Sequence, residues 1–333
     1  MDNQSLLNQF GIEPEQMITI GGYNGVYSKG IVYIMVPIAD REQNELMELH
    51  KLSNHLYTYG DQTIARFKAN KNQSYIGTFK DEPFVVLYNE HLRSINTSKM
   101  GRRLAEFHYR GKQFNEKVET ISRIGQWKDL WEKRLDQMEK VWEQKLFSEP
   151  EDEFDRLFIE SFPYFMGLAE NAIQYLADTE LDDDPQAEDA GTVCYQRFSR
   201  YLWEGDVCIK NPFDWVFDHA GRDITEWVRE HAQLHYRTYE NGIRSFFQEY
   251  QSLIPLSSFS WRLIFARLTF PLHYLEVVED YYLSNTEHNK KLSEDRLNTL
   301  INRTGDYEEL ISRFYELAGA PVRTLNLPRL GWI

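Results

Sequence analysis

The feature that most constrains the fold is a change from strand-like to helix-like sequence patterns about a quarter of the way along the chain. Between residues 17 and 89, short runs rich in β-branched and aromatic residues alternate with glycine, asparagine and lysine tracts, which is typical of short strands. These runs are MITI, GIVYIMVPI, TIARFKAN, SYIGTF and PFVVLY. One helix interrupts them, with Leu46, Leu49, His50 and Leu56 at helical spacing and an end near Gly60.

From residue 96 onward the pattern is helical. The segment SKMGRRLAEFHYRG places Leu104, Phe107 and His108 on one helix face. The next helix carries an apolar stripe made of Trp127, Leu130, Trp131, Leu135, Met138 and Trp142. Further helices are predicted in residues 152–177, 223–252, 258–283 and 291–318.

The segment Thr192–Asp223 departs from this helical pattern. A short strand ends at Cys194, a hairpin is predicted around Glu204-Gly205-Asp206, and a second strand and an acidic loop lead into a helix. The sequence therefore predicts an α+β protein with two lobes. A β-rich lobe with one helix covers residues 1–90, and a helical lobe covers residues 91–333 and contains the segment 192–223.

Composition excludes several classes of function. The chain has 333 residues and a formal net charge of -15, which argues against partners that present many phosphates, such as nucleic acid or anionic lipid. The N-terminus lacks a signal peptide, and no apolar run is long enough to cross a bilayer, so we expect synthesis in a cytoplasm. Cys194 and Cys208 are too few for a disulfide framework or a zinc site, and we expect both in the core.

The order of the lobes is that of a kinase-like phosphotransferase, and three motifs make the resemblance specific. MGRRLAEFHYRGKQF resembles the LAxFH helix of aminoglycoside phosphotransferase-like kinases. ISRIGQWKDLWEKRLDQME and VFDHAGRDITEWVRE are similar to segments of bacterial endospore coat proteins of the CotS/YutH type. The resemblance implies a kinase-like fold, synthesis in the mother-cell cytoplasm of a spore-forming bacillus, deposition in the spore coat, and other spore coat proteins as partners.

The same resemblance locates the positions that would carry out phosphoryl transfer, which needs a lysine, a catalytic base and two Mg²⁺ ligands. Val36 stands at the lysine position and Arg197 at the base. Arginine does not lose its proton in proteins and cannot act as a base. Leu202 replaces the metal-binding asparagine, and Asn211 replaces the first metal-binding aspartate. Lys29 is the nearest substitute for the lysine, and Glu45 or Glu48 would be its helix partner, although surface carboxylates are expected there.

Other candidate groups have structural explanations. Asp214 and Asp218 lie near the metal positions, but loop carboxylates are more often solvated, and the resemblance makes Asp223 a helix cap. His231 and His235 lack the glutamate and third ligand of a zinc site. The acidic run over residues 178–191 is expected to be a solvated loop.

The sequence therefore favours a catalytically degenerate kinase-like protein that acts as a structural or assembly component, with no cofactor, no metal and no small-molecule substrate. The alternative is a divergent phosphotransferase for a sugar or an amino alcohol. The cleft is expected to be either filled by its own side chains or used to dock a coat protein. The residues expected at these contacts are Tyr195, Gln196, Arg197, Phe213 and Asp214.

Overall fold

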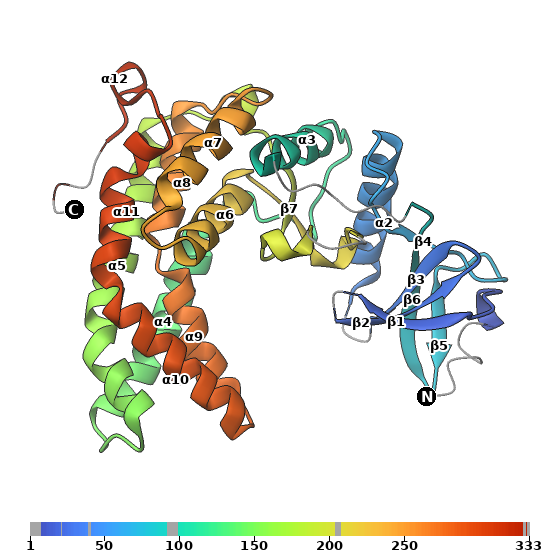
Figure 1. Ribbon diagram of the computed structural model, residues 1–333, viewed down its shortest axis with the longest axis horizontal. Coiled ribbons are helices and arrows are strands. Elements are labelled where there is room, and N and C mark those ends of the chain that lie inside the picture. Colours follow the sequence, from blue (N-terminus) through green and yellow to red (C-terminus); the bar gives the residue numbers. More distant parts are fainter. Residues whose placement is uncertain are drawn as a thin grey trace. The chain divides into compact units, whose positions relative to one another are not determined.

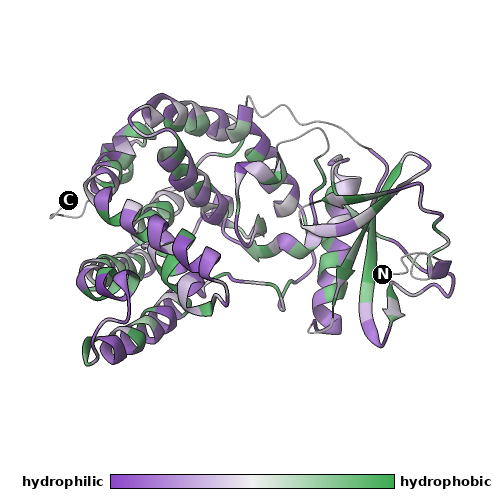
Figure 2. Cartoon of the chain, turned by 60° about the horizontal axis from the view of Figure 1, so that its bottom comes forward, coloured by the Kyte–Doolittle hydropathy of each residue, from purple (hydrophilic) through white to green (hydrophobic). Residues whose placement is uncertain are grey.

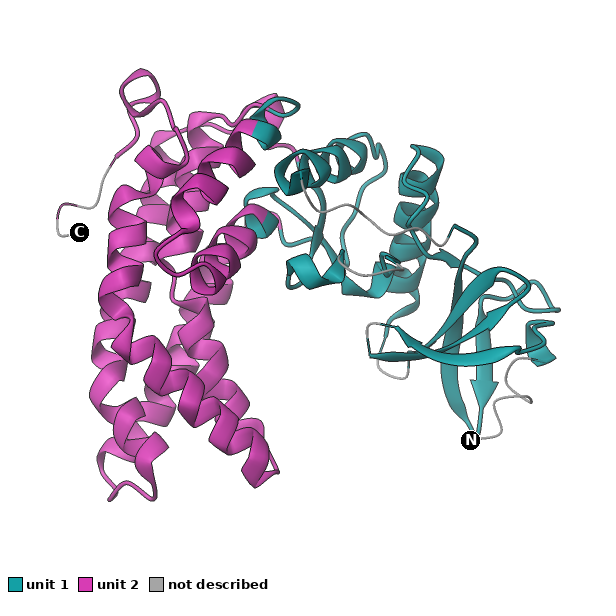
Figure 3. Cartoon of the chain, viewed as in Figure 1, with its two compact units in different colours: residues 1–123, 191–223, 249–254 teal, residues 124–190, 224–248, 255–333 magenta. Residues whose placement is uncertain are grey.

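The computed structural model describes residues 8–20, 22–38, 41–91, 99–203, 208–328 and 331. Its contacts divide the chain into two compact units (Figure 3). Unit 1 comprises residues 1–123, 191–223 and 249–254, and unit 2 comprises residues 124–190, 224–248 and 255–333. The hairpin predicted around Glu204-Gly205-Asp206 lies outside the described residues.

An antiparallel sheet forms the N-terminal part of unit 1 (Figure 1). The strands lie in the order β1-β2-β3-β6-β4, and β5 pairs with β6. Their bounds are β1 Gln16–Ile20, β2 Tyr23–Ser28, β3 Ile31–Pro37, β4 Arg66–Phe67, β5 Ile76–Phe79 and β6 Glu82–Asn89. Each run predicted from the sequence contributes a strand, and Figure 2 shows apolar stretches along them.

Strand β2 was not predicted, because its glycine-containing sequence YNGVYS was interpreted as punctuation between strands. The structure explains the glycine. A Cβ atom at Gly25 would lie 2.6 Å from the carbonyl oxygen of Tyr33, so only glycine allows β2 to approach β3 at this point.

The two faces of the sheet bury different sets of side chains. On one face Tyr33 joins Phe10, Ile12, Val26, Phe84 and Val86 in a core cluster. Successive strand residues point to opposite faces, so Val32, Ile34 and Val36 of β3 bury the other face. Helix α2 spans Gln43–Thr58 and buries Leu46, Leu49, Leu52 and Leu56, which confirms the predicted helix.

Two further strands and one helix complete the regular structure of unit 1. Strands β7 (Thr192–Tyr195) and β8 (Trp215–Asp218) pair in antiparallel fashion. Short 3-10 turns η3 (Arg200–Leu202) and η4 (Pro212–Asp214) lie between them. Helix α3 (Met100–Lys112) packs on β7 at Gly111, where a Cβ atom would lie 2.3 Å from Oγ1 of Thr192.

Unit 2 is helical. Helices α6 (Gly221–Leu234) and α7 (Tyr239–Gln251) lie mostly in it. Its other helices are α4 Trp127–Leu146, α5 Glu153–Asp182, α8 Ser258–Thr269, α9 Leu272–Leu283, α10 Glu287–Asn302, α11 Thr304–Leu317 and α12 Val322–Leu325. The predicted helices over 223–252, 258–283 and 291–318 each divide into two, and one division falls at Pro271, which cannot donate to a continuing helix. Among the described residues, no helix is long and apolar enough to span a membrane.

Two details of unit 2 depart from the sequence-based expectation. The acidic run begins inside α5 and includes the short turn η2 (Ala187–Asp189). Asp189 is buried and accepts hydrogen bonds from the hydroxyls of Ser257 and Ser260, so it is not part of a fully solvated loop. Helix α5 also contains Pro163, which has no N–H for the carbonyl of Ile159, and the indole of Trp142 on α4 donates to that oxygen at 3.0 Å.

Candidate functional site

The β7–β8 pair brings several predicted site residues together within unit 1. The backbone N–H of Gln196, directly after β7, donates to the carbonyl of Asp214 at 2.7 Å. Its side-chain amide donates to the carbonyl of Phe213 at 3.3 Å. The loop that carries Arg197 therefore lies beside the segment that enters β8.

Arg197 and Leu202 occupy this loop. The Arg197 side chain is exposed, and its guanidinium donates to the carbonyl of Gln196 at 3.4 Å. Leu202 ends the 3-10 turn η3 and is half-buried. Neither side chain can accept a proton at neutral pH or coordinate a cation.

The short turn η4 contains the other predicted positions. Asn211 caps it, because its Oδ1 accepts the N–H of Phe213 at 3.0 Å, while its buried Nδ2 has no hydrogen-bond partner in the described part of the chain. Phe213 is buried, packs 5.7 Å from the ring of Phe67 and lies under the guanidinium of Arg41 at 5.1 Å. Aromatic packing therefore fills the space around this turn.

Asp214 is the carboxylate of the site. Burial raises its pKa to about 6, against the lowering effect of the Arg41 charge. Burial also raises the pKa of Tyr23, with a further contribution from the negative charge of Asp214. A carboxylate, a guanidinium and a phenol thus influence one another where β2, the β3–α2 connection and η4 come together. Neither Tyr23 nor Arg41 lies in the sequence motifs that predicted the other site residues.

The position predicted for the lysine is apolar in its surroundings as well as in its side chain. Val36 is 3% exposed and pairs with Val85 of β6. Lys29 does not substitute for it, because it lies in the β2–β3 turn with a 73% exposed side chain 3.4 Å from Glu13. The helix glutamates are also engaged elsewhere: Glu45 pairs with Arg41, and Glu48 accepts the backbone N–H groups of residues 119–121.

Tyr195 points into an aromatic cluster. It is 1% exposed, its hydroxyl accepts the indole N–H of Trp203 at 2.8 Å, and its ring lies within 6 Å of Phe107 and Phe198. Tyr195 and Phe213 therefore offer no surface to a partner protein. Of the five predicted contact residues, Gln196 and Arg197 are exposed and Asp214 is half-buried.

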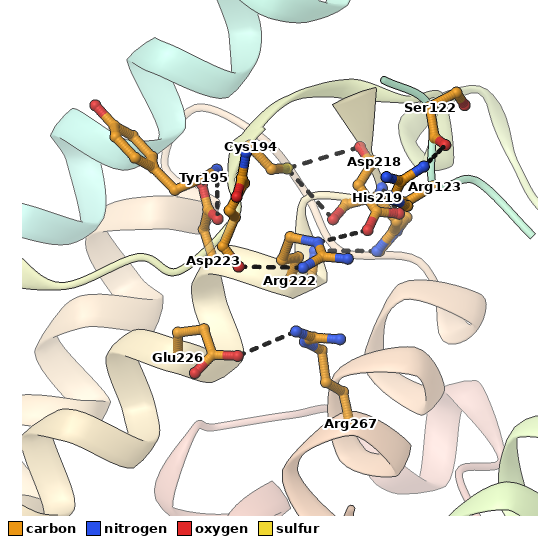
Figure 4. Close-up of polar contacts among 12 residues, drawn as sticks. Ser122, Arg123, Cys194, Tyr195, Asp218, His219, Arg222, Asp223, Glu226 and Arg267 are labelled. Carbon is orange, nitrogen blue, oxygen red and sulfur yellow. Dashed lines mark hydrogen bonds and ion pairs between the residues drawn. The ribbon is translucent and has the colours of Figure 1, made fainter. Parts of the chain in front are cut away.

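Tyr195 also belongs to a buried polar network, and Figure 4 shows its contact with Asp223. The carboxylate of Asp223 accepts the N–H of Tyr195 at 3.0 Å and contacts Nε2 of His108 at 3.1 Å. The other ring nitrogen of His108 lies 2.9 Å from the hydroxyl of Tyr250. Burial holds the pKa of His108 well below its usual value, so the neutral ring donates to Asp223 and accepts from Tyr250. Asp223 lies in the first turn of α6 and not before it, so the prediction that it caps the helix is corrected. Its carboxylate instead binds the backbone N–H of Tyr195, where the loop after β7 begins.

The network contains the types of side chain that bind a metal, but their ligand atoms already form hydrogen bonds within the protein. His108, Cys194 and Asp223 are the one group of three metal-binding side chains found among the described residues, with ligand atoms within 4.8 Å of one another. The His108 and Asp223 atoms already bond each other, and the thiol of Cys194 donates to the carbonyl of His219 at 3.5 Å. Both cysteines are buried and free, as predicted.

A buried ion pair adjoins this site. Nζ of Lys210 lies 2.6 Å from Asp61, and both side chains are 6% exposed. The ammonium also lies 4.2 Å from the ring of Trp203 and 4.9 Å from that of Phe107. Burial alone would raise the pKa of Asp61, but the charge and hydrogen bond of Lys210 lower it below its usual value. A lysine within the otherwise uncharged VCIKNPF is the sequence signal that could have revealed this pair.

The predicted histidine pair has a packing role. His231 stacks on Trp227 at 4.6 Å, and the rings of His231 and His235 lie 4.4 Å apart. Neither belongs to the three-residue group described above.

Comparisons with known proteins agree on the family. Residues 3–314 match the family described as "Spore coat putative kinase YutH". The chain is 42% identical over 302 residues to the endospore coat-associated protein YutH of Bacillus subtilis (strain 168), covering 90% of this chain and 88% of that protein. It is 21% identical over 217 residues to spore coat protein S of the same organism, covering 63% of this chain and 60% of that protein.

Solved structures agree on the fold. An aminoglycoside phosphotransferase from Alicyclobacillus acidocaldarius superposes with a TM-score of 0.67 at 14% identity, covering 95% of this chain and 96% of that one. A microcompartment-associated aminopropanol kinase gives a TM-score of 0.60 at 11% identity, covering 95% of this chain and 98% of that one. These confirm the predicted two-lobed, kinase-like α+β fold, and the sequence matches show that the chain belongs to the YutH family of spore coat proteins.

Proposed function

We propose that this protein acts in the spore coat as a structural or assembly component, and that its kinase-like cleft is catalytically degenerate. The main support is the set of side chains at the positions inferred for phosphoryl transfer. Val36, at the position inferred for the lysine, is buried in the sheet, and Arg197 is the residue at the position inferred for the base. Phosphoryl transfer depends on cations and a metal at the transferring phosphate, and such groups act as a unit.

The packing of η4 supports the filled form of the cleft. Phe213 and Tyr195 are buried, and Arg41 is held between Glu45 and the Phe213 ring. In this form the partners are other spore coat proteins, bound on exposed surface. Synthesis in the mother-cell cytoplasm is part of the same proposal.

One observation favours the alternative, a divergent small-molecule phosphotransferase. Asp214 is a half-buried carboxylate beside Gln196, and the Arg41 cation lies close enough to lower its pKa. A cation and a carboxylate in the cleft are two of the elements that a phosphoryl transfer site needs. A substitution of Asp214 can therefore distinguish the two proposals.

The test is recruitment to the coat. A fluorescent fusion of the full chain is expressed in sporulating Bacillus subtilis that lacks its own YutH. We expect the wild type and Asp214→Asn to reach the coat equally, because Asn has a similar size and the proposed role requires no catalysis. Asp218→Asn is the matched destabilised control, since Asp218 is buried and paired with Arg222 at 2.6 Å. Loss of coat signal in Asp214→Asn, with normal protein level and melting temperature, would show that recruitment needs the Asp214 carboxylate and would contradict the filled form of the cleft.

A binding measurement addresses the cleft directly. We expect Mg-ATP to leave the melting temperature of the purified chain unchanged. A ligand present at about 100 times its dissociation constant stabilises a protein by about 2.7 kcal/mol, which is visible as a shift of a few degrees. A Mg²⁺-dependent shift of the melting temperature that disappears in Asp214→Asn would contradict the proposal that the cleft is catalytically degenerate.

A further inference from the structure

A cavity of about 350 Å³ lies within unit 2, and none of its lining residues belongs to the candidate site described above. Residues of α5, α6, α7, α9, α10 and α11 line it. The volume falls in the range of small-molecule pockets, which are usually apolar with a few polar groups.

Aromatic side chains form much of the wall. They are Tyr164, Phe165, Tyr236, Tyr239, His273 and Tyr307. The rings of His273 and Tyr307 lie 4.6 Å apart. A wall rich in aromatic side chains favours a ligand that is itself an aromatic ring, because rings gain from stacked or edge-on contact beyond their buried area.

The wall is fixed in advance of binding. The Tyr307 hydroxyl donates to the carbonyl of Leu268, and Nε of Arg229 lies 3.3 Å from the same hydroxyl. Arg229 is buried, pairs with Glu226 at 3.1 Å and donates to the carbonyl of Arg267 at 2.8 Å. A wall that is already ordered loses little side-chain freedom when a ligand binds.

The charged side chains of the lining balance one another in number. They are the carboxylates of Asp295 and Asp306 and the guanidinium groups of Arg296 and Arg303. Arg296 also lies 3.0 Å from Asp280, and Asp295 lies 3.5 Å from Lys291. The lining therefore has no excess of one sign, which favours an uncharged ligand.

His273 supplies a polar group. Burial, assisted by the Arg229 charge, lowers its pKa to about 3, so the ring is neutral. The ring is half-buried and keeps some exposed surface where it lines the cavity. A neutral imidazole can donate or accept a hydrogen bond, so it suits a hydroxyl or an amide.

We propose that this cavity is a binding site for a small uncharged aromatic molecule carrying a hydroxyl or amide group. The ligand stacks against the aromatic wall and meets the imidazole of His273. This site is independent of the kinase-like cleft and of the proposed role in the coat.

The test uses phenol as the probe and the full chain in solution. Phenol is titrated by saturation-transfer NMR, with toluene and cyclohexanol as probes that lack the hydroxyl or the aromatic ring. Thr299→Trp places an indole at the cavity from an exposed position, and Asn298→Trp is its matched control on the same helix outside the lining. His273→Phe keeps the ring and removes the polar atoms. Thermal melts confirm that each variant is folded.

We expect saturable phenol binding that Thr299→Trp weakens at least tenfold and Asn298→Trp leaves unchanged. His273→Phe weakens phenol several-fold and leaves toluene unaffected, and cyclohexanol binds less tightly than phenol. Absence of saturation in the wild type, or equal binding by wild type and Thr299→Trp, overturns the site. Equal binding of phenol and cyclohexanol overturns its preference for aromatic rings, and an equal loss of phenol and toluene in His273→Phe overturns the polar role.

Discussion

At the scale of single residues, the buried Lys210–Asp61 pair should contribute measurably to stability. We expect Lys210→Met to lower the free energy of unfolding by about 3 kcal/mol, because it leaves the Asp61 carboxylate buried without its ammonium partner. Arg110 lies 3.8 Å from Asp61 and still offers it a positive charge, so the loss should lie near the lower end of the values typical of broken buried ion pairs. Urea unfolding measures it. Lys51→Met, which breaks an exposed pair with Glu116, is the control and should cost under about 1 kcal/mol. Equal losses of unfolding free energy in Lys210→Met and Lys51→Met would show that burial does not make the Lys210–Asp61 pair more important for stability.

The neutral His108 predicts a pH dependence. Its folded-state pKa lies well below the ordinary value, so the unfolded chain binds a proton near pH 6.5 that the folded chain does not. Stability from this group is complete above about pH 6.5 and falls as the pH drops below it, by at most about 1.4 kcal/mol per pH unit.

The variant His108→Gln isolates this effect, since glutamine can still donate and accept but does not titrate. We expect urea melts at pH 7, 6 and 5 to show a shallower loss for His108→Gln than for the wild type. His288→Gln, at an exposed position, should keep the wild-type slope. An unchanged slope in His108→Gln would show that the ring is charged in the folded state.

At the scale of elements, the α3–β7 contact depends on a residue without a side chain. We expect Gly111→Ala to destabilise the protein by about 1–3 kcal/mol, because the new methyl group would overlap Thr192 and the backbone of Val193. Gly167→Ala in α5 is the control: it meets no atom within 4 Å and should stabilise its helix by up to about 1 kcal/mol. Thermal melts of the two variants should move in opposite directions.

One of the hydrogen bonds that couple helices α4 and α5 runs from Trp142 to the carbonyl of Ile159, which Pro163 leaves without a donor. We expect Trp142→Phe to cost about 1–3 kcal/mol in the wild type, since a partly buried carbonyl loses its partner. The cost should be about 1 kcal/mol smaller in a Pro163→Ala background, where residue 163 supplies the missing N–H. A double-mutant cycle in urea measures the coupling, and a cost that is identical in both backgrounds would disprove it.

The sequence predicted the elements better than the contacts between them. The periodicity of Leu46, Leu49 and Leu56 located α2, because apolar spacing follows directly from helix geometry. It did not locate β2, since Gly25 is required by the approach of β3, which no local pattern records. Counting along motifs likewise missed Arg41, because its contact with Phe213 depends on segments distant in sequence. The assignment of the catalytic positions stays a prediction.

At the scale of the whole molecule, the proposed loss of catalysis is spread over several segments, so no single substitution should reverse it. We expect Arg197→Asp to show no ATP turnover, because Val36 and Leu202 would still lack the required charge and metal ligand. The measurement is ADP release with Mg-ATP and a panel of sugars and amino alcohols. Turnover above that of the wild type would mean that the rest of the site is intact and that the register of the loop is wrong.

Unit 1 is built from three separate segments of the chain, and this has a consequence for synthesis on the ribosome. The first 123 residues contain the N-terminal sheet and α3, but β7, β8 and Tyr250 of the same unit come up to about 130 residues later. At about 5–20 residues per second, the emerged segment waits roughly 5–19 seconds for β8 and roughly 6–25 seconds for Tyr250. During this interval the face of α3 that contains Gly111 and His108 is without β7 and Asp223. The nascent chain thus exposes an apolar surface that the finished protein buries, and a chaperone has time to bind it.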